Sequence, residues 1–285
     1  MSTSLRLGLL GRDISYSLSP AIFEWGFRTT DISGTYVIHD VPEEHLAPLI
    51  ESNAWDGLNV TIPYKAAALR FCQQVTVAAR DAGAVNTLYR KDGDVWGDNT
   101  DLAGFGYAVA RRKGAEEHFH NVLVIGSGGA ARAVVVALSK GYHRMAITVA
   151  SRDAARARRR LSEYVESADL SFASLENARE SLEGFDLIVN ATPSGSRSCP
   201  GSPLAPPLHF NPASLVMDLI YEPRKTLLLQ AADERGARTE NGLVMLLAQA
   251  AASFQIWTGR EFPLKRALTE FLPRLESYDP LSHGG

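Results

Sequence analysis

A run of apolar, mostly β-branched residues that ends in a glycine-rich turn constrains the fold of this chain more than any other segment. The run is Val122–Ile125, and the turn reads Gly126-Ser127-Gly128-Gly129-Ala130-Ala131, with helix-compatible sequence following to Lys140. A strand, a tight turn and a helix in this order are typical of dinucleotide-binding domains. The first glycine permits the turn, the second lets the backbone approach a pyrophosphate, and the final small residue lets the helix lie close to the strand. We therefore predict that the phosphates of a nucleotide bind at the start of this helix, on Gly126, Ser127, Gly128, Gly129 and Ala130.

Strand-like and helix-like segments alternate along the chain, which predicts an α/β fold with a parallel sheet. Before the turn we expect strands at Leu5–Gly11, Thr35–Val41, Leu58–Thr61, Thr87–Arg90 and Val95–Gly97, and helices at Ser19–Thr29, Pro42–Ser52 and from Asp101. After it we expect strands at Met145–Ala150, Asp186–Asn190 and Leu215–Leu219, and a helix at Ala154–Val165. Asp92-Gly93 predicts a hairpin turn, and the Pro/Gly/Ser-rich stretch Ser194–Pro207 is typical of a linker.

The segment from Gly242 to Trp257 predicts a further helix with one apolar stripe. Met245, Gln249 and Ser253 are spaced by four and share another face of this helix. A glutamine in so apolar a helix needs a hydrogen-bonding partner, which is either the nearby backbone or a ligand in a cleft.

Composition narrows the function classes. The net charge of −3 gives no electrostatic reason to expect a nucleic acid or an anionic membrane as partner. The two cysteines, Cys72 and Cys199, match no metal-ligand spacing, and the sequence suggests no metal site. The basic cluster from Arg156 to Arg160 is typical of a solvated helix face. Without an apolar signal segment or membrane span, we expect a cytoplasmic protein with a small-molecule substrate.

Four more segments occur in an order that resembles the shikimate dehydrogenase family. They are Ser17-Leu18-Ser19-Pro20, Asn59–Lys65, Gly83–Thr87 and Gly97–Asp101, and the glycine-rich turn and the Asn241–Ala251 helix extend the match. The resemblance implies reversible, NADP-dependent reduction of 3-dehydroshikimate to shikimate, on the pathway to chorismate and the aromatic amino acids. It also implies an N-terminal α/β substrate domain (residues 1–101 and 238–285, with the C-terminal helices returning to it) and a Rossmann-type NADP-binding domain (residues 102–237).

The resemblance also implies the roles of individual residues. Ser17 and Ser19 would bind the substrate carboxylate, with Tyr221 near it, and the ring hydroxyls would be bound by Thr61, Lys65, Asn86, Asp101 and Gln249. Lys65 and Asp101 would be the catalytic pair. On the cofactor side, the resemblance adds Thr192, Gly242 and Met245.

The residue types fit this chemistry, although each has a plainer interpretation. The hydroxyls of Ser17 and Ser19, just before a helix, could converge on an anion, but Ser19 could also be only a helix cap. Lys65 is charged at neutral pH and can stabilise the alkoxide that forms when a ketone is reduced. Without the surrounding motifs, Lys65 would be interpreted as a surface residue and Asp101 as a helix cap.

The choice of cofactor can be inferred from the residues after the second strand of the nucleotide domain. Arg152 and Arg156 lie four apart and could hold a 2′-phosphate together, with Ser151 beside them. The family commonly has Asn-Arg-Thr where this chain has Ser151-Arg152-Asp153, and an inward-pointing Asp153 would repel the phosphate. We prefer Asp153 as the cap of the following helix, so the sequence favours NADP and leaves NAD use open.

Two other functions are compatible with the sequence. One is a quinate/shikimate-type paralogue with relaxed substrate or NAD use. The other is a non-catalytic metabolite sensor, against which the retained Lys65, Asp101 and glycines argue. The oligomeric state, with a homodimer as one option, the physiological direction and the group that transfers the proton are left open.

Overall fold

The computed structural model describes residues 4–112, 118–141, 145–162 and 169–277. By their internal contacts the residues divide into two compact units. Unit 1 comprises Met1–Gly104 and Leu246–Gly285, and unit 2 comprises Phe105–Met245. The chain passes from one unit to the other within α4 (Asp101–Arg112) and returns within α9 (Leu243–Thr258).

Unit 1 contains a six-stranded sheet in the order β2-β1-β3-β5-β6-β4. Its strands are β1 (Leu5–Gly11), β2 (Gly34–Asp40), β3 (Gly57–Val60), β4 (Gln74–Val75), β5 (Thr87–Lys91) and β6 (Asp94–Asp98). β1 pairs parallel with β2 and β3, whereas β5 runs antiparallel to β3 and β6. The predicted hairpin is confirmed, because Asp92 and Gly93 both have positive φ, as a tight β5–β6 turn requires. The expectation of a parallel sheet is therefore wrong for this unit, whose sheet is mixed.

The helices of unit 1 are α1 (Ser19–Thr30), α2 (Leu46–Glu51), α3 (Val77–Ala82), most of α9, α10 (Leu264–Arg266) and α11 (Leu272–Ser277), with short 3-10 turns at Glu43–His45 and Ala67–Phe71 and a π-turn at Ala267–Phe271. Aromatic side chains join α1 to α9: the rings of Phe23 and Trp257 lie 5.4 Å apart and those of Phe27 and Phe254 lie 6.0 Å apart. The apolar stripe of α9 is therefore buried against the N-terminal part of the chain. This packing fixes where the polar residues of α9 lie along the sheet.

Unit 2 contains a parallel sheet in the order β12-β11-β10-β7-β8-β9. The strands are β7 (Asn121–Ile125), β8 (Ala146–Ser151), β9 (Asp169–Ser174), β10 (Leu187–Asn190), β11 (Leu215–Asp218) and β12 (Arg238–Glu240). Counted within the unit, this is the order 3-2-1-4-5-6 that is typical of dinucleotide-binding domains. The predicted α/β class is confirmed.

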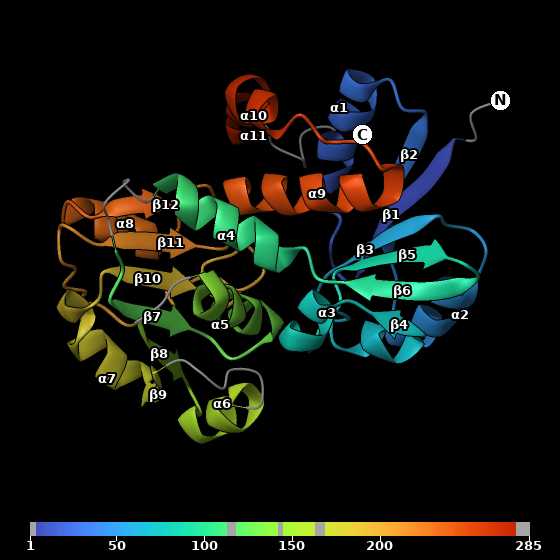
Figure 1. Cartoon of the computed structure of the whole chain (residues 1–285). Helices are drawn as coiled ribbons and strands as arrows, with labels where there is room; N and C mark the ends of the chain where they lie inside the picture. The colour runs from blue at the N-terminus through green and yellow to red at the C-terminus, as the bar shows by residue number, and fades with distance from the viewer. Residues whose placement is uncertain (1–3, 113–117, 142–144, 163–168, 278–285) are drawn as a thin grey trace. The chain divides into compact units, whose positions relative to one another are not determined.

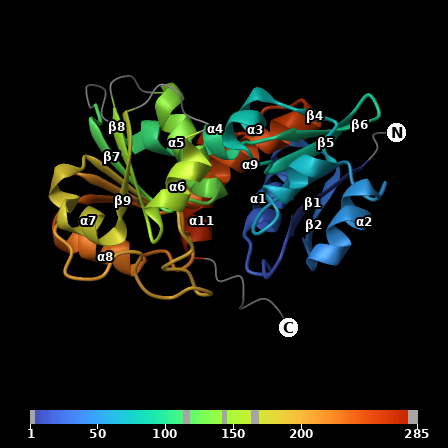
Figure 2. The ribbon, with the colours of Figure 1, turned by 90° about the horizontal axis from the view of Figure 1, so that it is seen from below.

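Helices cover both faces of this sheet (Figures 1 and 2). α5 (Gly129–Gly141) and α6 (Ala154–Leu161) lie on one face, and α7 (Leu175–Glu180) and α8 (Leu227–Glu234) on the other. This division follows from right-handed crossovers, since the chain moves outward from β7 to β9 and then in the opposite direction from β10 to β12. Among the described helices, none is both long and apolar enough to span a bilayer.

The domain boundaries differ from those expected from the sequence. We expected residue 238 to begin the return to the first domain, but β12 pairs with β11, so the chain leaves unit 2 only after Met245. Leu102, Ala103 and Gly104, assigned to the second domain, belong to unit 1. The helix expected at Ala154–Val165 ends at Leu161, and its last predicted residues lie outside the described part of the chain.

A buried carboxylate ties together three segments of unit 2. Oδ1 of Asp218 accepts hydrogen bonds from Asn190 Nδ2 (3.0 Å) and the Ile220 amide (3.1 Å), and Oδ2 accepts one from Thr226 Oγ1 (2.7 Å). Burial raises the pKa of Asp218 to about 6, although these three hydrogen bonds act in the opposite direction. Asp218 thus links the ends of β10 and β11 to Thr226, the N-cap of α8.

The raised pKa predicts a pH-dependent difference between the wild type and the Asp218→Asn variant. Between pH 4 and pH 6 the folded protein binds more protons at Asp218 than the unfolded chain does, so its contribution to the free energy of unfolding falls as pH rises. The stability of the wild type relative to the variant should fall by about 2 kcal/mol over this range and level off above about pH 7. Urea unfolding of both proteins at several pH values measures the difference; parallel profiles would contradict the raised pKa.

Candidate functional site

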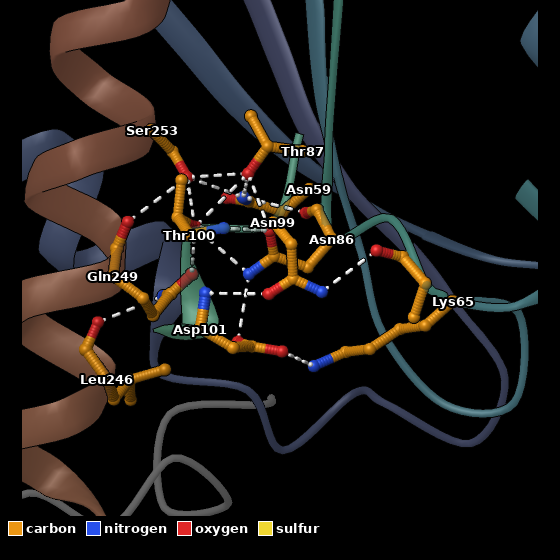
Figure 3. Close-up of polar contacts among 11 residues, drawn as sticks. Asn59, Lys65, Asn86, Thr87, Asn99, Thr100, Asp101, Leu246, Gln249 and Ser253 are labelled. Carbon is orange, nitrogen blue, oxygen red and sulfur yellow. Dashed lines mark hydrogen bonds and ion pairs between the residues drawn. The ribbon is translucent and has the colours of Figure 1, made fainter. Parts of the chain in front are cut away.

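The centre of the polar site in unit 1 is an ion pair between Lys65 and Asp101. Lys65 Nζ lies 2.6 Å from Asp101 Oδ2, and the two side chains are 21% and 8% exposed. Lys65 follows the loop after β3, while Asp101 is the first residue of α4 (Figure 3). The structure therefore brings together the two residues that the sequence predicts as a catalytic pair, and their catalytic role stays a prediction.

The amide of Asn86 holds the other oxygen of Asp101. Asn86 Nδ2 donates to Asp101 Oδ1 (2.8 Å) and to Thr100 Oγ1 (2.9 Å), and Oδ1 accepts from the Thr100 amide (2.7 Å). The backbone donor fixes which end of the Asn86 side chain faces Asp101. Since both carboxylate oxygens of Asp101 are engaged by side chains, the interpretation of Asp101 as only a helix cap is wrong.

Behind this amide lies a cluster of three buried hydroxyls, which we call the hydroxyl cluster: Thr87, Thr100 and Ser253. Ser253 Oγ lies 2.9 Å from Thr87 Oγ1 and 3.1 Å from Thr100 Oγ1. Asn59 Nδ2 donates to Ser253 Oγ (3.0 Å) and Ser253 Oγ donates to the Gln249 carbonyl (3.1 Å). Figure 3 shows Gln249 and Ser253 of α9 joined by polar contacts to Asn59, Thr87 and Thr100.

Gln249 satisfies both ends of its amide. Its Nε2 donates to the Leu246 carbonyl (2.9 Å), as the backbone interpretation predicted, and its Oε1 faces Thr100 Oγ1 at 3.5 Å. Gln249 is nearly buried. The structure therefore places it beside the hydroxyl cluster, within reach of the residues around Asp101.

Ser17, Ser19 and Thr61 lie elsewhere in unit 1. Ser17 Oγ donates to Ser19 Oγ (3.2 Å) and accepts from the Ser19 amide (3.2 Å) at the start of α1. Leu18 is the N-cap and makes no side-chain cap bond, so the interpretation of Ser19 as the cap is wrong. The Thr61 amide donates to the Leu10 carbonyl (2.9 Å), which puts Thr61 next to the end of β1. No hydrogen bond among the described residues joins these three side chains to Lys65 or Asp101.

The glycine-rich turn of unit 2 has the predicted conformation. Gly126 has a φ of +121°, which L side chains rarely adopt, and it follows β7 directly. A Cβ at Gly128 would meet no protein atom within 4 Å, so its lack of a side chain serves no packing contact with the protein. Ala131 is fully buried where α5 meets the sheet. Open space at Gly128 is what a ligand that contacts the backbone needs.

A cavity of about 760 Å³ opens at this turn. Of the predicted cofactor residues, seven line it: Gly126, Ser127, Gly128, Ser151, Arg152, Arg156 and Thr192. The predicted Gly129, Ala130, Gly242 and Met245 are not among its lining residues. Ser151 Oγ is buried and has no hydrogen-bond partner in the described structure. An unpaired buried hydroxyl in the wall of a cavity indicates a site for a polar ligand.

The structure settles the role of Asp153, which the sequence left open, and corrects two predictions from the sequence, those for Arg160 and for the stretch Ser194–Pro207. Asp153 Oδ1 accepts from the Arg156 amide (2.8 Å), which confirms Asp153 as the N-cap of α6. Arg160 also lines the cavity, so the basic cluster is not only a solvated face. The stretch Ser194–Pro207 is not a plain linker, because Cys199, Ser202 and Pro203 form part of the wall and Leu204 is buried in the core.

The remaining predicted residues, Tyr221, Gly242 and Met245, belong to unit 2. The Tyr221 carbonyl accepts a hydrogen bond from Arg224, whose guanidinium also pairs with Glu222 (2.8 Å). A Cβ at Gly242 would lie 2.2 Å from the Leu219 carbonyl oxygen. Gly242 is thus required by close backbone packing, which is sufficient reason for a glycine there.

Comparisons with known protein families match most of the chain. A family model described as the shikimate dehydrogenase substrate binding domain matches residues 9–88. A shikimate / quinate 5-dehydrogenase model matches residues 108–200, and a shikimate 5'-dehydrogenase C-terminal domain model matches residues 242–268.

Individual relatives are similar over nearly their full length. A shikimate dehydrogenase (NADP(+)) of Salinibacter ruber is 37% identical over 270 residues, covering 92% of this chain and 95% of the relative. The crystal structure of shikimate 5-dehydrogenase from Thermus thermophilus, in complex with NADP(H) and shikimate, is 34% identical with a TM-score of 0.77 and covers 92% of this chain and 96% of its own. A quinate dehydrogenase from Corynebacterium glutamicum in complex with NAD is 28% identical with a TM-score of 0.82, covering 95% of this chain and 99% of its own.

The hydroxyl cluster predicts that Ser253→Ala destabilises the protein. The change removes an acceptor for Asn59 and a neighbour of two buried hydroxyls, so the free energy of unfolding should fall by about 1–3 kcal/mol. Thr258→Ala is the matched control, since Thr258 Oγ1 makes the same bond to the carbonyl four residues earlier in α9 (2.7 Å) but is less buried. Urea unfolding should show a clearly smaller loss for Thr258→Ala; equal losses would mean that the cluster adds nothing beyond a helix-surface hydrogen bond.

Proposed function

Because the chain belongs to the shikimate dehydrogenase family, we propose that it catalyses the reversible, NADP-dependent reduction of 3-dehydroshikimate to shikimate, on the pathway to chorismate and the aromatic amino acids. The observation that carries the proposal is the Lys65–Asp101 pair, held by Asn86 at a 2.8 Å contact to Asp101. A positive charge next to hydroxyl-binding groups is what reduction of a ring ketone requires.

In the proposed reaction Lys65 stabilises the charge that forms on the carbonyl oxygen. NADPH, when bound, supplies the hydride that reduces the carbonyl carbon. The electron pair of the C=O bond moves onto oxygen, where the Lys65 ammonium donates a hydrogen bond and then a proton. Asp101 keeps Nζ in place and accepts from an adjacent ring hydroxyl. In the oxidation of shikimate, neutral Lys65 takes the hydroxyl proton instead.

We assign the substrate contacts by the chemistry of each side chain. The Ser17 and Ser19 hydroxyls, at the N-terminus of α1, suit the carboxylate, and Tyr221 is proposed to lie near it. Amide and hydroxyl groups, which both donate and accept, suit the ring hydroxyls, as do an ammonium donor and a carboxylate acceptor. These contacts are assigned to Thr61, Lys65, Asn86, Asp101 and Gln249.

The cofactor is assigned to unit 2. The pyrophosphate is proposed to bind at the start of α5, where Gly128 leaves space. Ser151, Arg152 and Arg156 are proposed to hold the 2′-phosphate, because guanidinium groups bind phosphates through paired hydrogen bonds. The further proposed contacts are Gly126, Ser127, Gly129, Ala130, Thr192, Gly242 and Met245.

The proposed reaction needs only small-molecule partners, and we place it in the cytoplasm. A homodimer stays a proposal that light scattering on the purified protein can test.

The test of the proposal is the appearance of NADPH absorbance when shikimate and NADP are added to the purified protein. We expect a clear rate, with slower reaction when NAD replaces NADP. Quinate, which carries one more hydroxyl and no ring double bond, is the second substrate to assay, because a structural relative is a quinate dehydrogenase. A higher kcat/KM for quinate would favour that activity, and no rate with either acid would overturn the proposal.

Lys65→Met tests the proposed role of the ammonium. The side chain keeps its approximate length but loses its charge and its proton, so kcat for shikimate should fall by about 10²- to 10⁴-fold with a smaller change in KM. Steady-state kinetics measure both parameters. If kcat stays near the wild-type value, Lys65 only binds substrate and another group delivers the proton.

Arg152→Ala tests the proposed phosphate contact. Loss of the guanidinium should raise KM for NADP by about 10-fold and leave KM for NAD nearly unchanged, since only the 2′-phosphate differs between them. Parallel assays with both cofactors give the two ratios. Equal increases for both would assign Arg152 to the structure of the turn rather than to the phosphate.

A further inference from the structure

The charged side chains that line the cavity at the glycine-rich turn are few and come from one segment, residues 152–160. Among the described lining residues, the charged ones are Arg152, Asp153, Arg156 and Arg160. All four are exposed to solvent. Ser151, with its unpartnered buried hydroxyl, is adjacent in sequence and lines the same cavity. The unpaired hydroxyl points to a ligand independently of the charges.

Arg156 and Arg160 share one face of α6. They are four residues apart, so their side chains are neighbours on the helix surface. Both residues line the cavity, so this face of α6 is the one that contributes to its wall. Arg158, on the same helix, packs instead over the ring of Phe172 at 5.2 Å. On α6, Arg156 and Arg160 therefore line the cavity, whereas Arg158 does not.

Asp153 places a negative charge at the position where a 2′-phosphate is expected. Its carboxylate is held as the cap of α6 by the 2.8 Å bond from the Arg156 amide, so it stays at the helix N-terminus. With Asp153 and two arginines alone, the cavity end would carry a net charge of only about +1. With Arg160 the net charge is about +2, which matches the charge of about −1.5 to −2 on a phosphate monoester at neutral pH.

We infer that Arg160 determines the specificity of this cavity for a 2′-phosphorylated dinucleotide by offsetting the capping carboxylate of Asp153. The inference rests on the proposed use of NADP and extends it. The positive charge of Arg160 offsets the negative charge of Asp153. Asp153 can therefore cap α6 without excluding the phosphate.

The experiment is calorimetric titration of the full-length protein with NADP⁺ and with NAD⁺, in the absence of substrate. Arg160→Ala should weaken NADP⁺ binding by about 5- to 10-fold and leave the Kd for NAD⁺ unchanged. Arg158→Ala is the matched control and should change neither Kd. An unchanged Kd for NADP⁺ in Arg160→Ala, or an equal loss for both dinucleotides, would overturn the inference.

A second variant tests the charge offset itself. Asn is as good an N-cap as Asp, so Asp153→Asn removes the charge and keeps the cap. Combined with Arg160→Ala, it restores the net charge of about +2, and the double variant should bind NADP⁺ within about 2-fold of the wild type. A double variant that binds NADP⁺ as weakly as Arg160→Ala alone would overturn the inference that Arg160 compensates the charge of Asp153.

The binding readout separates this inference from the proposed reaction. If the protein fails to oxidise shikimate but shows this pattern of affinities, the reaction is wrong and the role of Arg160 stands. If it oxidises shikimate with NADP while Arg160→Ala binds NADP⁺ normally, the reaction stands and the role of Arg160 is wrong.

Discussion

The site in unit 1 depends on a single amide whose orientation is fixed. Asn86 Oδ1 accepts from the backbone amide of Thr100 at 2.7 Å, so the Nδ2 donors of Asn86 face Asp101. A nearly buried carboxylate is costly unless it is paired and hydrogen-bonded. Asn86 supplies the hydrogen bond and Lys65 the charge. The position of the lysine is thus a consequence of buried polar contacts that begin at the backbone amide of Thr100, between β6 and α4.

This constraint explains why so apolar a helix as α9 carries polar residues. Ser253 and Gln249 add hydrogen bonds to Asn59, Thr87 and Thr100 that an apolar helix face would not supply. The aromatic contacts between α1 and α9 supply the apolar burial, and the polar residues set the register between helix and sheet. In unit 2 the carboxylate of Asp153 caps α6, and the arginines that line the same cavity give it a net positive charge.

Local sequence signals were sufficient for the α/β class, the glycine-rich turn, the hairpin at Asp92-Gly93 and the cap at Asp153. Each depends on residues that are near one another in the chain. The hydroxyl cluster was not predictable in this way, because Thr87, Thr100 and Ser253 come from a strand, a helix start and a distant helix. Arg160 was interpreted as a surface residue because only the position of the cavity distinguishes it from Arg158. The predicted domain boundary at residue 238 is wrong because β12 was not recognised as a strand. It has only three residues, too few for a periodic pattern.

The central claim is that Lys65 and Asp101 act as one unit in catalysis, and a double-mutant cycle on kcat tests it most directly. The single changes are Lys65→Met and Asp101→Asn, and the double variant combines them. Since Asp101 is proposed to act by positioning the Lys65 ammonium, the double variant should have nearly the kcat of Lys65→Met alone. A double variant whose loss is the product of the two single losses would show that the residues act independently and would contradict the account.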